Sequence, residues 1–273
     1  MVRILDYNGQ EADRMVTVAT ITNLKADGRQ LAQVTAGTAD EAHAAELAGI
    51  EMVVCMANSV PVVRQGSSQV FVTAAIDFGG AITEDDILGA AFEALADGAD
   101  AVITARSLRS VERLVAEDIP VMGHLGFVPK KSTIYGGIRS VGKTATEATA
   151  LWAQFQRLEN AGAFAVECEL IPANVMAVIN DRTGMATISL GSGAGADVLF
   201  LFSSDICGEG RVPRHARQYG DIATLQDQIR DERVRALAAF RADVTCGGFP
   251  NETETVIAPA DEFAGFIAAL DRA

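Results

Sequence analysis

Short apolar segments alternate with alanine-rich segments along most of the chain, and this alternation constrains the fold more than any other feature. The apolar segments are six to eight residues long and rich in valine, isoleucine and leucine, as strands are. Most are followed by segments with helical spacing, although we expect a loop after the second one. The eight predicted strands are 31–36, 51–57, 70–76, 100–105, 119–125, 163–170, 185–191 and 197–203.

Apolar strands separated by helices are typical of a parallel sheet that is covered on both faces. Eight strand–helix units in 273 residues predict an α/β fold, a single (β/α)8 TIM barrel. A doubly wound sheet is the alternative, but the chain has no GxGxxG pattern after the first predicted strand. No linker or low-complexity tract interrupts the pattern, so we expect one domain over 1–273, with an N-terminal extension of about 1–17 and a C-terminal tail of about 253–273.

Composition excludes several classes of function. The formal net charge of −14 argues against a protein that binds the phosphate backbone of nucleic acids, because such a protein needs a basic face. No apolar run is long enough to cross a membrane, and the N-terminus lacks the pattern of a signal peptide. We therefore expect no nucleic-acid or membrane partner and a cytoplasmic location. The four widely spaced cysteines, without a CxxC pair, predict buried thiols rather than a zinc site or disulfides.

Polar residues follow the predicted strands, at the end of a barrel where active sites are built. Residue type and position alone leave their roles open, because a histidine on an apolar strand is also compatible with a core position. Glu167 and Glu169 would point to the same face of their strand, so either could be the working acid. The candidates at the strand ends are Asn58, Ser59, Asp77, Arg106, His124, Glu169 and Ser192.

The segment "PVMGHLGFVPKKSTIYGGIRSVGK" (120–143) resembles the P-V-x-G-H-L-G-L-x-P segment, with its later Gly-Gly pair, of the ketopantoate (3-methyl-2-oxobutanoate) hydroxymethyltransferase family. Downstream, "ENAGAFAVECELIPANVMAVI" and "TISLGSGAGADVLFLFSSDICG" are similar to the strand bearing the family's glutamate and to its glycine-rich run. The resemblance covers about 18–252 and is most specific after Pro120.

This resemblance implies a barrel of the phosphoenolpyruvate mutase/isocitrate lyase superfamily, commonly a multimer, so we expect a homo-oligomer. It implies an enzyme that transfers a one-carbon unit from methylene-tetrahydrofolate to a branched 2-oxo acid, a reaction of pantothenate biosynthesis, with magnesium holding the oxo acid. It also favours Glu169 as the base and His124 as a hydrogen-bond donor, and it places the loop with Gly136 and Gly137 beside the site.

The departures from the family pattern concern its metal-binding acids. The family has an acid after its second, third and fourth strands, and the matching positions here are Ala57, Ala75 and Ala105. Asp77 could supply a metal ligand from a shifted position, or it could cap the helix that begins near Thr83. We therefore expect no magnesium bound in the family's way, and the cofactor stays open.

Other groups could hold an anionic substrate in place of a cation. A guanidinium such as that of Arg106 can grip a carboxylate, although the same residue could lie in an exposed helix turn capped by Ser107. Glycine backbone near Lys130 and Lys131 could approach an anion, or the loop could be flexible. The predicted substrate-binding residues are Asn58, Ser59, Arg106, Gly136, Gly137 and Ser192.

The leading hypothesis is an enzyme like the family, a transferase acting on a small 2-oxo acid by enolate or aldol chemistry. One alternative is a lyase or decarboxylase of the same superfamily that breaks a C–C bond. The other is a non-catalytic relative that binds a small carboxylate, which the three alanines favour. In each case the expected partner is a small-molecule 2-oxo acid or carboxylate.

Overall fold

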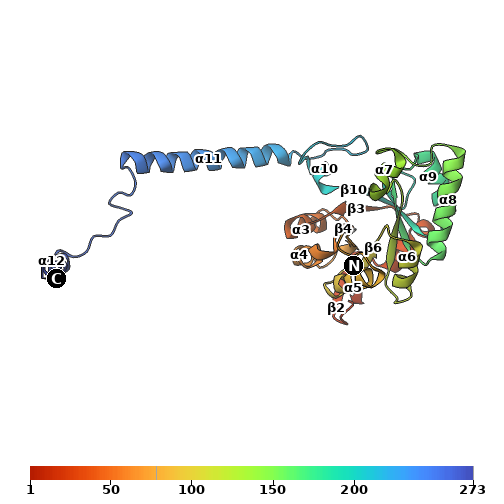
Figure 1. Ribbon diagram of the computed structural model, residues 1–273, viewed down its shortest axis with the longest axis horizontal. Helices are drawn as coiled ribbons and strands as arrows, with labels where there is room; N and C mark the ends of the chain where they lie inside the picture. The colour runs from red at the N-terminus through yellow and green to blue at the C-terminus, as the bar shows by residue number, and fades with distance from the viewer. Residues whose placement is uncertain (78, 273) are drawn as a thin grey trace. The chain divides into compact units, whose positions relative to one another are not determined.

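The protein, a computed structural model, is described over residues 1–77 and 79–272 and divides into two compact units, Met1–Gly220 and Asp221–Ala273. The first unit confirms the predicted (β/α)8 TIM barrel. Its eight parallel strands close in the order β10-β3-β4-β5-β6-β7-β8-β9 (Figure 1). A closed barrel excludes the doubly wound alternative, because a doubly wound sheet is open and has two edge strands.

Each apolar segment predicted as a strand corresponds to one barrel strand. The register between β7 and β8 places His124 beside Glu167 and Gly126 beside Glu169. Since registered neighbours carry their side chains to the same face, His124 and Glu167 both point into the barrel. The strands are β3 Leu31–Thr35, β4 Met52–Met56, β5 Phe71–Ala75, β6 Ala101–Ile103, β7 Val121–Gly126, β8 Ala165–Glu169, β9 Ala186–Leu190 and β10 Val198–Leu201.

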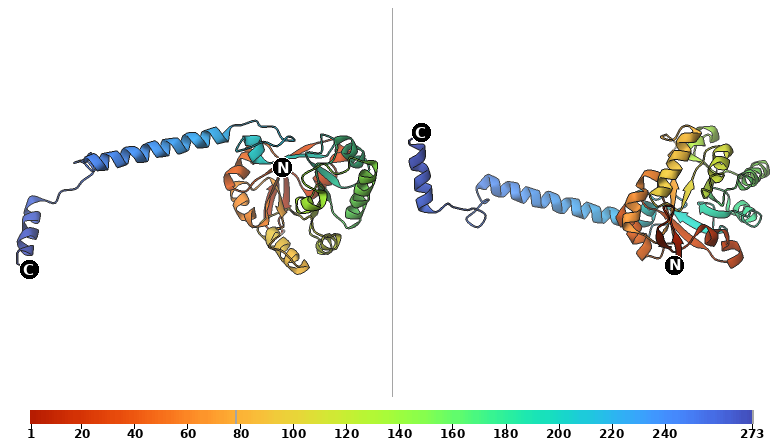
Figure 2. Two further views of the ribbon diagram at one scale, coloured as in Figure 1. Left: turned by 45° about the horizontal axis from the view of Figure 1, so that its top comes forward. Right: turned by 90° about the horizontal axis from the view of Figure 1, so that it is seen from below.

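Helices follow the strands and cover the outside of the barrel (Figure 2). The prediction of a loop after the second strand is wrong, because helix α4 forms there. Pro61 lies in the first turn of this helix, where no backbone N–H is needed. Thr83 caps α5 by accepting from the N–H of Asp86, so Asp77 is not that cap. The helices and 3₁₀ turns are α3 Ala39–Leu47, η1 Ala57–Ser59, α4 Val60–Gly66, α5 Glu84–Ala96, α6 Leu108–Val115, η2 Pro129–Lys131, α7 Ser132–Tyr135, α8 Ala145–Asn160, α9 Ala173–Asn180 and α10 Ser203–Cys207.

Residues before the first barrel strand pack against the barrel interior. Two helices, α1 (Val18–Thr22) and α2 (Leu24–Asp27), insert Ile21 and Leu24 among the apolar side chains inside the barrel, and both side chains are fully buried. An antiparallel hairpin of β1 and β2 precedes them. Its strands are Val2–Leu5 and Glu11–Arg14.

A buried ion network fastens this hairpin to the barrel. Arg14 Nε lies 2.8 Å from one carboxylate oxygen of Asp100, and Arg64 Nη2 lies 2.6 Å from the other. The backbone N–H of Val72 also donates to Asp100, at 2.8 Å. Buried charges are tolerated when they are paired and hydrogen-bonded, and Asp100 meets both conditions.

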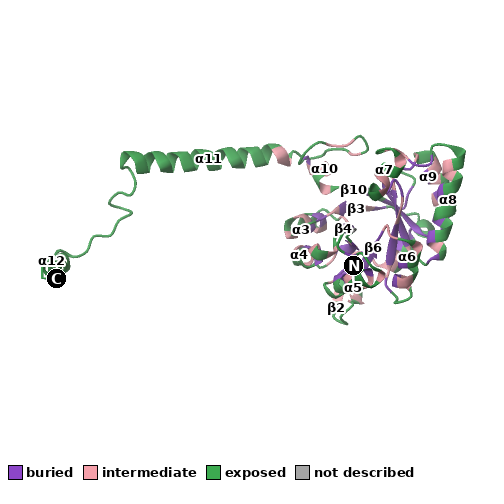
Figure 3. Cartoon of the chain, in the orientation of Figure 1, coloured by how far each residue is buried: buried purple, intermediate pink, exposed green. Residues whose placement is uncertain are grey.

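The barrel strands contribute side chains to two apolar clusters, one on each face of the sheet. Alternate side chains such as Met52, Phe71 and Ile188 fill the barrel, whereas Val72 and Phe155 belong to the layer between strands and helices. Figure 3 shows burial concentrated on the strands of this unit. Apolar side chains therefore fill the lower barrel, and a cavity lies at the carboxyl ends of the strands.

The second unit consists of two helices, α11 (Ile222–Cys246) and α12 (Ala260–Leu270). Apart from the half-buried Ile222 and Ala223, their residues are exposed in the single chain (Figure 3). Over the described residues, no helix is both long and apolar enough to cross a membrane. One side of α11 carries large apolar side chains at helical spacing, namely Leu225, Ile229, Leu237, Phe240 and Val244.

Candidate active site

A cavity of about 400 Å³ opens at the carboxyl ends of the barrel strands. Its walls are mostly apolar and include Val54, Ile103 and Phe200. Such a cavity suits a small ligand with an apolar body, while a few polar groups fix its orientation. The polar side chains that line it are Thr35, Ser59, Asp77, Thr104, His124 and Glu167.

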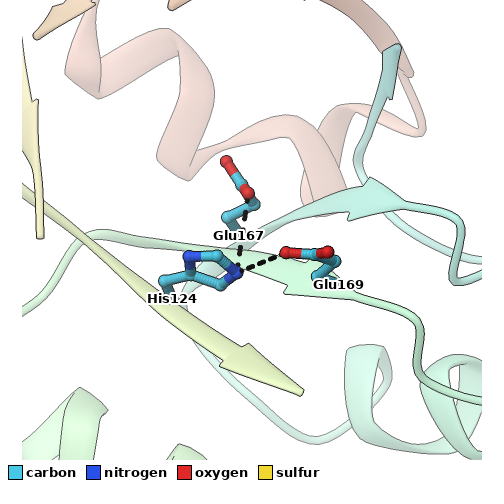
Figure 4. A group of neighbouring side chains, drawn as sticks. All are labelled: His124, Glu167 and Glu169. Carbon is cyan, nitrogen blue, oxygen red and sulfur yellow. Dashed lines mark hydrogen bonds and ion pairs between the residues drawn. The ribbon is translucent and has the colours of Figure 1, made fainter. Parts of the chain in front are cut away.

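Three titratable side chains from β7 and β8 lie together, and two of them, His124 and Glu167, line this cavity (Figure 4). His124 Nε2 donates a hydrogen bond to Glu169 Oε2 at 3.0 Å and lies 3.6 Å from Glu167 Oε1. The side chains of His124, Glu167 and Glu169 are only 10%, 8% and 15% exposed. Glu167 lines the cavity together with His124, and Glu169 approaches the same imidazole nitrogen from beside it.

The local sequence explains why these groups meet. Glu167 and Glu169 are two residues apart in one strand, so both point to the inner face. Gly126 lets β7 approach the end of β8, because its φ is +86° and a Cβ there would lie 2.2 Å from the carbonyl oxygen of Glu169. No other residue type fits this position without moving the backbone of β8.

Burial and charge shift the proton affinities of the cluster. Burial lowers the pKa of His124, but the hydrogen bond to Glu169 and the charges of both glutamates outweigh it, so the pKa is raised. Burial also raises the pKa of Glu167; the positive charge of His124 opposes this shift and the negative charge of Glu169 adds to it. The cluster therefore retains protons that exposed groups would release.

This arrangement suits proton transfer to and from a small carbonyl compound. An imidazolium beside a carboxylate provides a donor and a base within one hydrogen bond of each other. An apolar cavity strengthens every electrostatic interaction with a bound anion, because water is largely excluded. The pattern is that of a site that stabilises negative charge on an oxygen.

The structure brings several sequence-predicted residues to this region. Ser59 and Asp77 line the main cavity. Asn58 does not line this cavity. It lines a neighbouring cavity of about 590 Å³, which Asp77 also lines. Arg106 lines a third cavity, of about 210 Å³, that reaches His124 from the side of α6 and α8. Arg106 also donates to the carbonyl of Ala81.

Three other predicted residues are placed elsewhere. Ser192 is fully buried, and its hydroxyl donates to the carbonyl of Cys168 at 2.7 Å and accepts from the N–H of Ile171 at 2.8 Å. These bonds hold the ends of β8 and β9 together. Gly136 and Gly137 are exposed where α7 ends, with open space around each Cα. Their predicted contact with substrate stays a prediction.

The residues present do not fit magnesium held as in the family. Ala75 and Ala105 line the cavity where the family pattern has acids, and Ala57 opens the turn η1. Asp77 accepts hydrogen bonds from the backbone of Gly79 and Gly80, at 3.1 and 2.9 Å, and so orders its own loop. Among the described residues, the set close enough to hold a metal ion is His124 with the two glutamates, ligand atoms within 4.8 Å of one another. Magnesium prefers oxygen ligands, and this set includes an imidazole.

Sequence reasoning missed the hydroxyl groups of the cavity. Thr35 ends β3 and Thr104 follows β6, and both line the main cavity with Phe202. Thr35 continues the inward alternation of Leu31 in β3, and that was the available signal. Thr104 follows the inward-pointing Ile103, so alternation does not predict its place at the cavity. Sequence analysis used the polar residues just beyond the strands instead.

Sequence comparisons show which known proteins this chain resembles. Residues 55–252 match the model of the family described as ketopantoate hydroxymethyltransferase. The 3-methyl-2-oxobutanoate hydroxymethyltransferase of Thermobifida fusca (strain YX) is 32% identical over 270 residues, covering 89% of this chain and 94% of that protein. The enzyme of the same name from Shouchella clausii (strain KSM-K16) is 29% identical, covering 88% and 94%.

Solved structures share the barrel at low sequence identity. A phosphonopyruvate hydrolase in complex with oxalate and magnesium superposes with a TM-score of 0.50 at 13% identity, covering 94% of this chain and 97% of that one. The carboxyl transferase domain of Rhizobium etli pyruvate carboxylase gives 0.53 at 12% identity, covering 75% and 46%. At these identities the likeness concerns the fold alone.

Proposed function

The chain belongs to the ketopantoate hydroxymethyltransferase family, and from this membership we propose that it acts on a small 2-oxo acid by enolate or aldol chemistry. The observation that carries the proposal is the buried cluster of His124, Glu167 and Glu169 beside an apolar cavity at the carboxyl ends of the strands. A 2-oxo acid such as 3-methyl-2-oxobutanoate offers a C–H bond next to a carbonyl, which a positioned base can break.

In the proposed reaction, Glu169 removes the proton from the carbon next to the carbonyl. His124 stabilises the oxygen on which negative charge then develops. Support for these roles comes from the 3.0 Å hydrogen bond between the two side chains and from their burial. The small apolar cavity supports a branched, short-chain substrate.

We assign no step to magnesium, because alanines occupy the positions of the family's acids. The family's one-carbon donor, methylene-tetrahydrofolate, is the first co-substrate to test. The same three alanines, Ala57, Ala75 and Ala105, favour a second candidate function, a non-catalytic protein that binds a small carboxylate in this cavity.

Isotope exchange separates the two functions. The enzyme is incubated with 3-methyl-2-oxobutanoate in deuterium oxide, and loss of the C3 proton signal is followed by NMR. We expect exchange by the wild type, and loss of at least about 100-fold in Glu169→Gln, the range typical of a missing general base. Glu112→Gln, an exposed change on α6, is the matched control and leaves the rate unchanged.

The outcome that contradicts the enzymatic proposal is the absence of exchange with a panel of 2-oxo acids, including pyruvate and 2-oxobutanoate. If these acids still bind, as measured by calorimetry, the binding function takes its place. Exchange that persists after EDTA treatment supports chemistry that does not depend on a loosely held metal.

We also propose that the protein is a homo-oligomer. The support comes from α11, whose apolar side chains from Leu225 to Val244 are exposed in the single chain. Exposed apolar stripes of this length mark protein–protein contacts more often than solvent-facing surface.

A further inference from the structure

An enolate-forming site needs something to neutralise the negative charge that develops on the substrate oxygen. In this chain the wall formed by β5 and β6 offers Ala75 and Ala105 at the positions where the family has acids. Without a cation held there, the stabilising group has to come from another wall of the cavity. The adjoining wall, formed by β7 and β8, carries the buried titratable groups.

Glu167 is the buried carboxyl group that faces the cavity. Its side chain is 8% exposed, and it lines the cavity together with His124. In β9, the strand beside it, the registered residue is Ile188, which offers neither charge nor hydrogen bond. Its carboxyl oxygen Oε1 lies 3.6 Å from His124 Nε2, which is longer than a hydrogen bond.

The cluster has two carboxyl groups and one imidazole, so its charge state follows from geometry. His124 Nε2 lies 3.0 Å from Glu169 Oε2 and 3.6 Å from Glu167 Oε1, so Glu169 is the carboxyl group with the close donor. A second ionised carboxylate in the same apolar space would be repelled by the first and poorly solvated. Two carboxyl groups in such a position hold a proton between them, and it resides on the one without the close donor.

We propose that Glu167 carries this proton and donates it in a hydrogen bond to an anionic oxygen of the bound 2-oxo acid and of its enolate. A neutral carboxylic acid on β8 thereby takes the place of the cation that the family pattern holds at the ends of β5 and β6. The inference rests on the proposed function and adds a catalytic residue to it. The ligand class is a small carboxylate with an adjacent carbonyl oxygen.

The proton and electron balance is simple. Glu169 takes the proton from the carbon, the C–H electron pair forms the C=C bond, and the carbonyl π electrons move to the oxygen. Glu167 meets that oxygen with its O–H group, either sharing the proton or giving it up to form the enol. In the exchange reaction, Glu169 returns a proton to the carbon and Glu167 takes its own proton back, which regenerates the site.

Glutamine and leucine at position 167 distinguish this role from others. Glu167→Gln keeps a neutral donor of the same shape, so we expect isotope exchange within about tenfold of the wild type. Glu167→Leu removes the donor, and we expect a loss of at least about 100-fold, the effect of removing one oxyanion donor. If Glu167 were a base or a metal ligand, both variants would lose isotope exchange equally, and that result overturns the proposal.

Oxalate binding tests the same residue without any turnover. Oxalate is a planar anion that resembles the enolate of pyruvate, and its affinity is measured by calorimetry at pH 6 and pH 8.5. The charged or titratable groups that face Glu167 are His124, Glu169 and, across the cavity, Asp77. We expect weaker binding at pH 8.5 for the wild type, a smaller change for Glu167→Gln, and weak binding at both pH values for Glu167→Leu.

The two readouts separate the failure of this inference from that of the proposed function. If the wild type shows no exchange but oxalate binding by the variants follows the expected order, the proposed enzymatic function is wrong and Glu167 is still a hydrogen-bond donor. If the wild type and Glu167→Leu exchange at equal rates, Glu167 has no role in the reaction and the inference is wrong. Circular dichroism and urea unfolding check that each variant is folded, and Glu112→Gln serves as the control throughout.

Discussion

At the scale of single residues, the cluster of His124, Glu167 and Glu169 couples protonation to the stability of the barrel. The pKa of His124 and the pKa of Glu167 are both raised, so the folded protein binds more protons than the unfolded chain in the range where these groups titrate. A raised pKa contributes stability that is complete below the unfolded pKa and is lost as the pH rises through the folded pKa.

We therefore predict that the urea midpoint of unfolding falls between pH 5 and pH 9. Glu167→Gln removes one of the two groups, so its midpoint should fall less over the same range, whereas Glu112→Gln should follow the wild type. Far-UV circular dichroism at several urea concentrations measures both. A midpoint that rises with pH would contradict the shift directions.

The thiol of Cys55 gives a second residue-scale prediction. Burial raises its pKa to about 11, although the positive charge of Arg64 opposes the shift. At pH 8 the thiolate fraction of such a group is about 100-fold below that of a thiol with a pKa near 8.5. We expect iodoacetamide to modify exposed Cys246 quickly and Cys55 at least about 100-fold more slowly, followed by mass spectrometry of peptides. Comparable rates for the two residues would show that the cavity wall opens.

The sequence motif predicted two residues that lie together at the candidate site, but it did not predict the individual contacts around them. G-H-L-G and the strand with two glutamates pointed to His124 and Glu169, and the structure places these two side chains 3.0 Å apart. Composition and spacing could not reveal that the Ser192 hydroxyl makes hydrogen bonds with two backbone groups, because both groups belong to β8 and the residues after it. The buried-thiol prediction holds for Cys55 and Cys168, whereas Cys246 is exposed.

At the scale of elements, β7 is the strand on which the site depends. Gly126 has a left-handed φ, and the carbonyl of Glu169 occupies the space where a side chain would begin. We predict that Gly126→Ala lowers the free energy of unfolding by on the order of 3 kcal/mol, since backbone strain and a clash combine. It should also reduce isotope exchange, because the end of β8 has to move.

The matched control for that change is Gly89→Ala in α5. Gly89 has open space around its Cα and an ordinary helical conformation, so alanine should stabilise the helix by up to about 1 kcal/mol. Thermal and urea unfolding of both variants compare the two effects. If Gly126→Ala were as stable as the wild type, the close approach of β7 and β8 would be wrong.

The strand pattern was predictable because apolar runs of this length leave few alternatives to buried parallel strands. Helix α4 was not, because Pro61 argues for a loop unless its position at a helix start is known. Thr38, Thr83 and Ser107 cap the helices that follow them, and these local bonds are readable from sequence once the boundary is fixed.

At the scale of the whole molecule, the exposed apolar side of α11 bears on self-association. We predict that replacing Leu237 and Phe240 with aspartate lowers the mass measured by size-exclusion chromatography with light scattering. Replacing Ala238 and Ala242 with aspartate adds the same charge to another side of the helix and should leave the mass unchanged. A wild type that is already monomeric at micromolar concentration would contradict the proposed homo-oligomer.

The division of the chain at Gly220 was not visible in the sequence, which carries no linker there. A helix of 25 residues begins at Ile222, and its apolar positions have the spacing of any amphipathic helix. What such a face contacts depends on surfaces far away in the chain or in another copy. Local periodicity holds no information on that point.

The barrel closes by pairing β10 with β3, so that Val198 lies in register with Leu31. During synthesis, a nascent chain that has left the ribosome only as far as β9 therefore presents two unpaired strand edges, separated by more than a hundred residues. Closure must wait until residue 201 has cleared the exit tunnel. Until then both edges are open to pairing with another chain, so misassembly competes with folding over that interval.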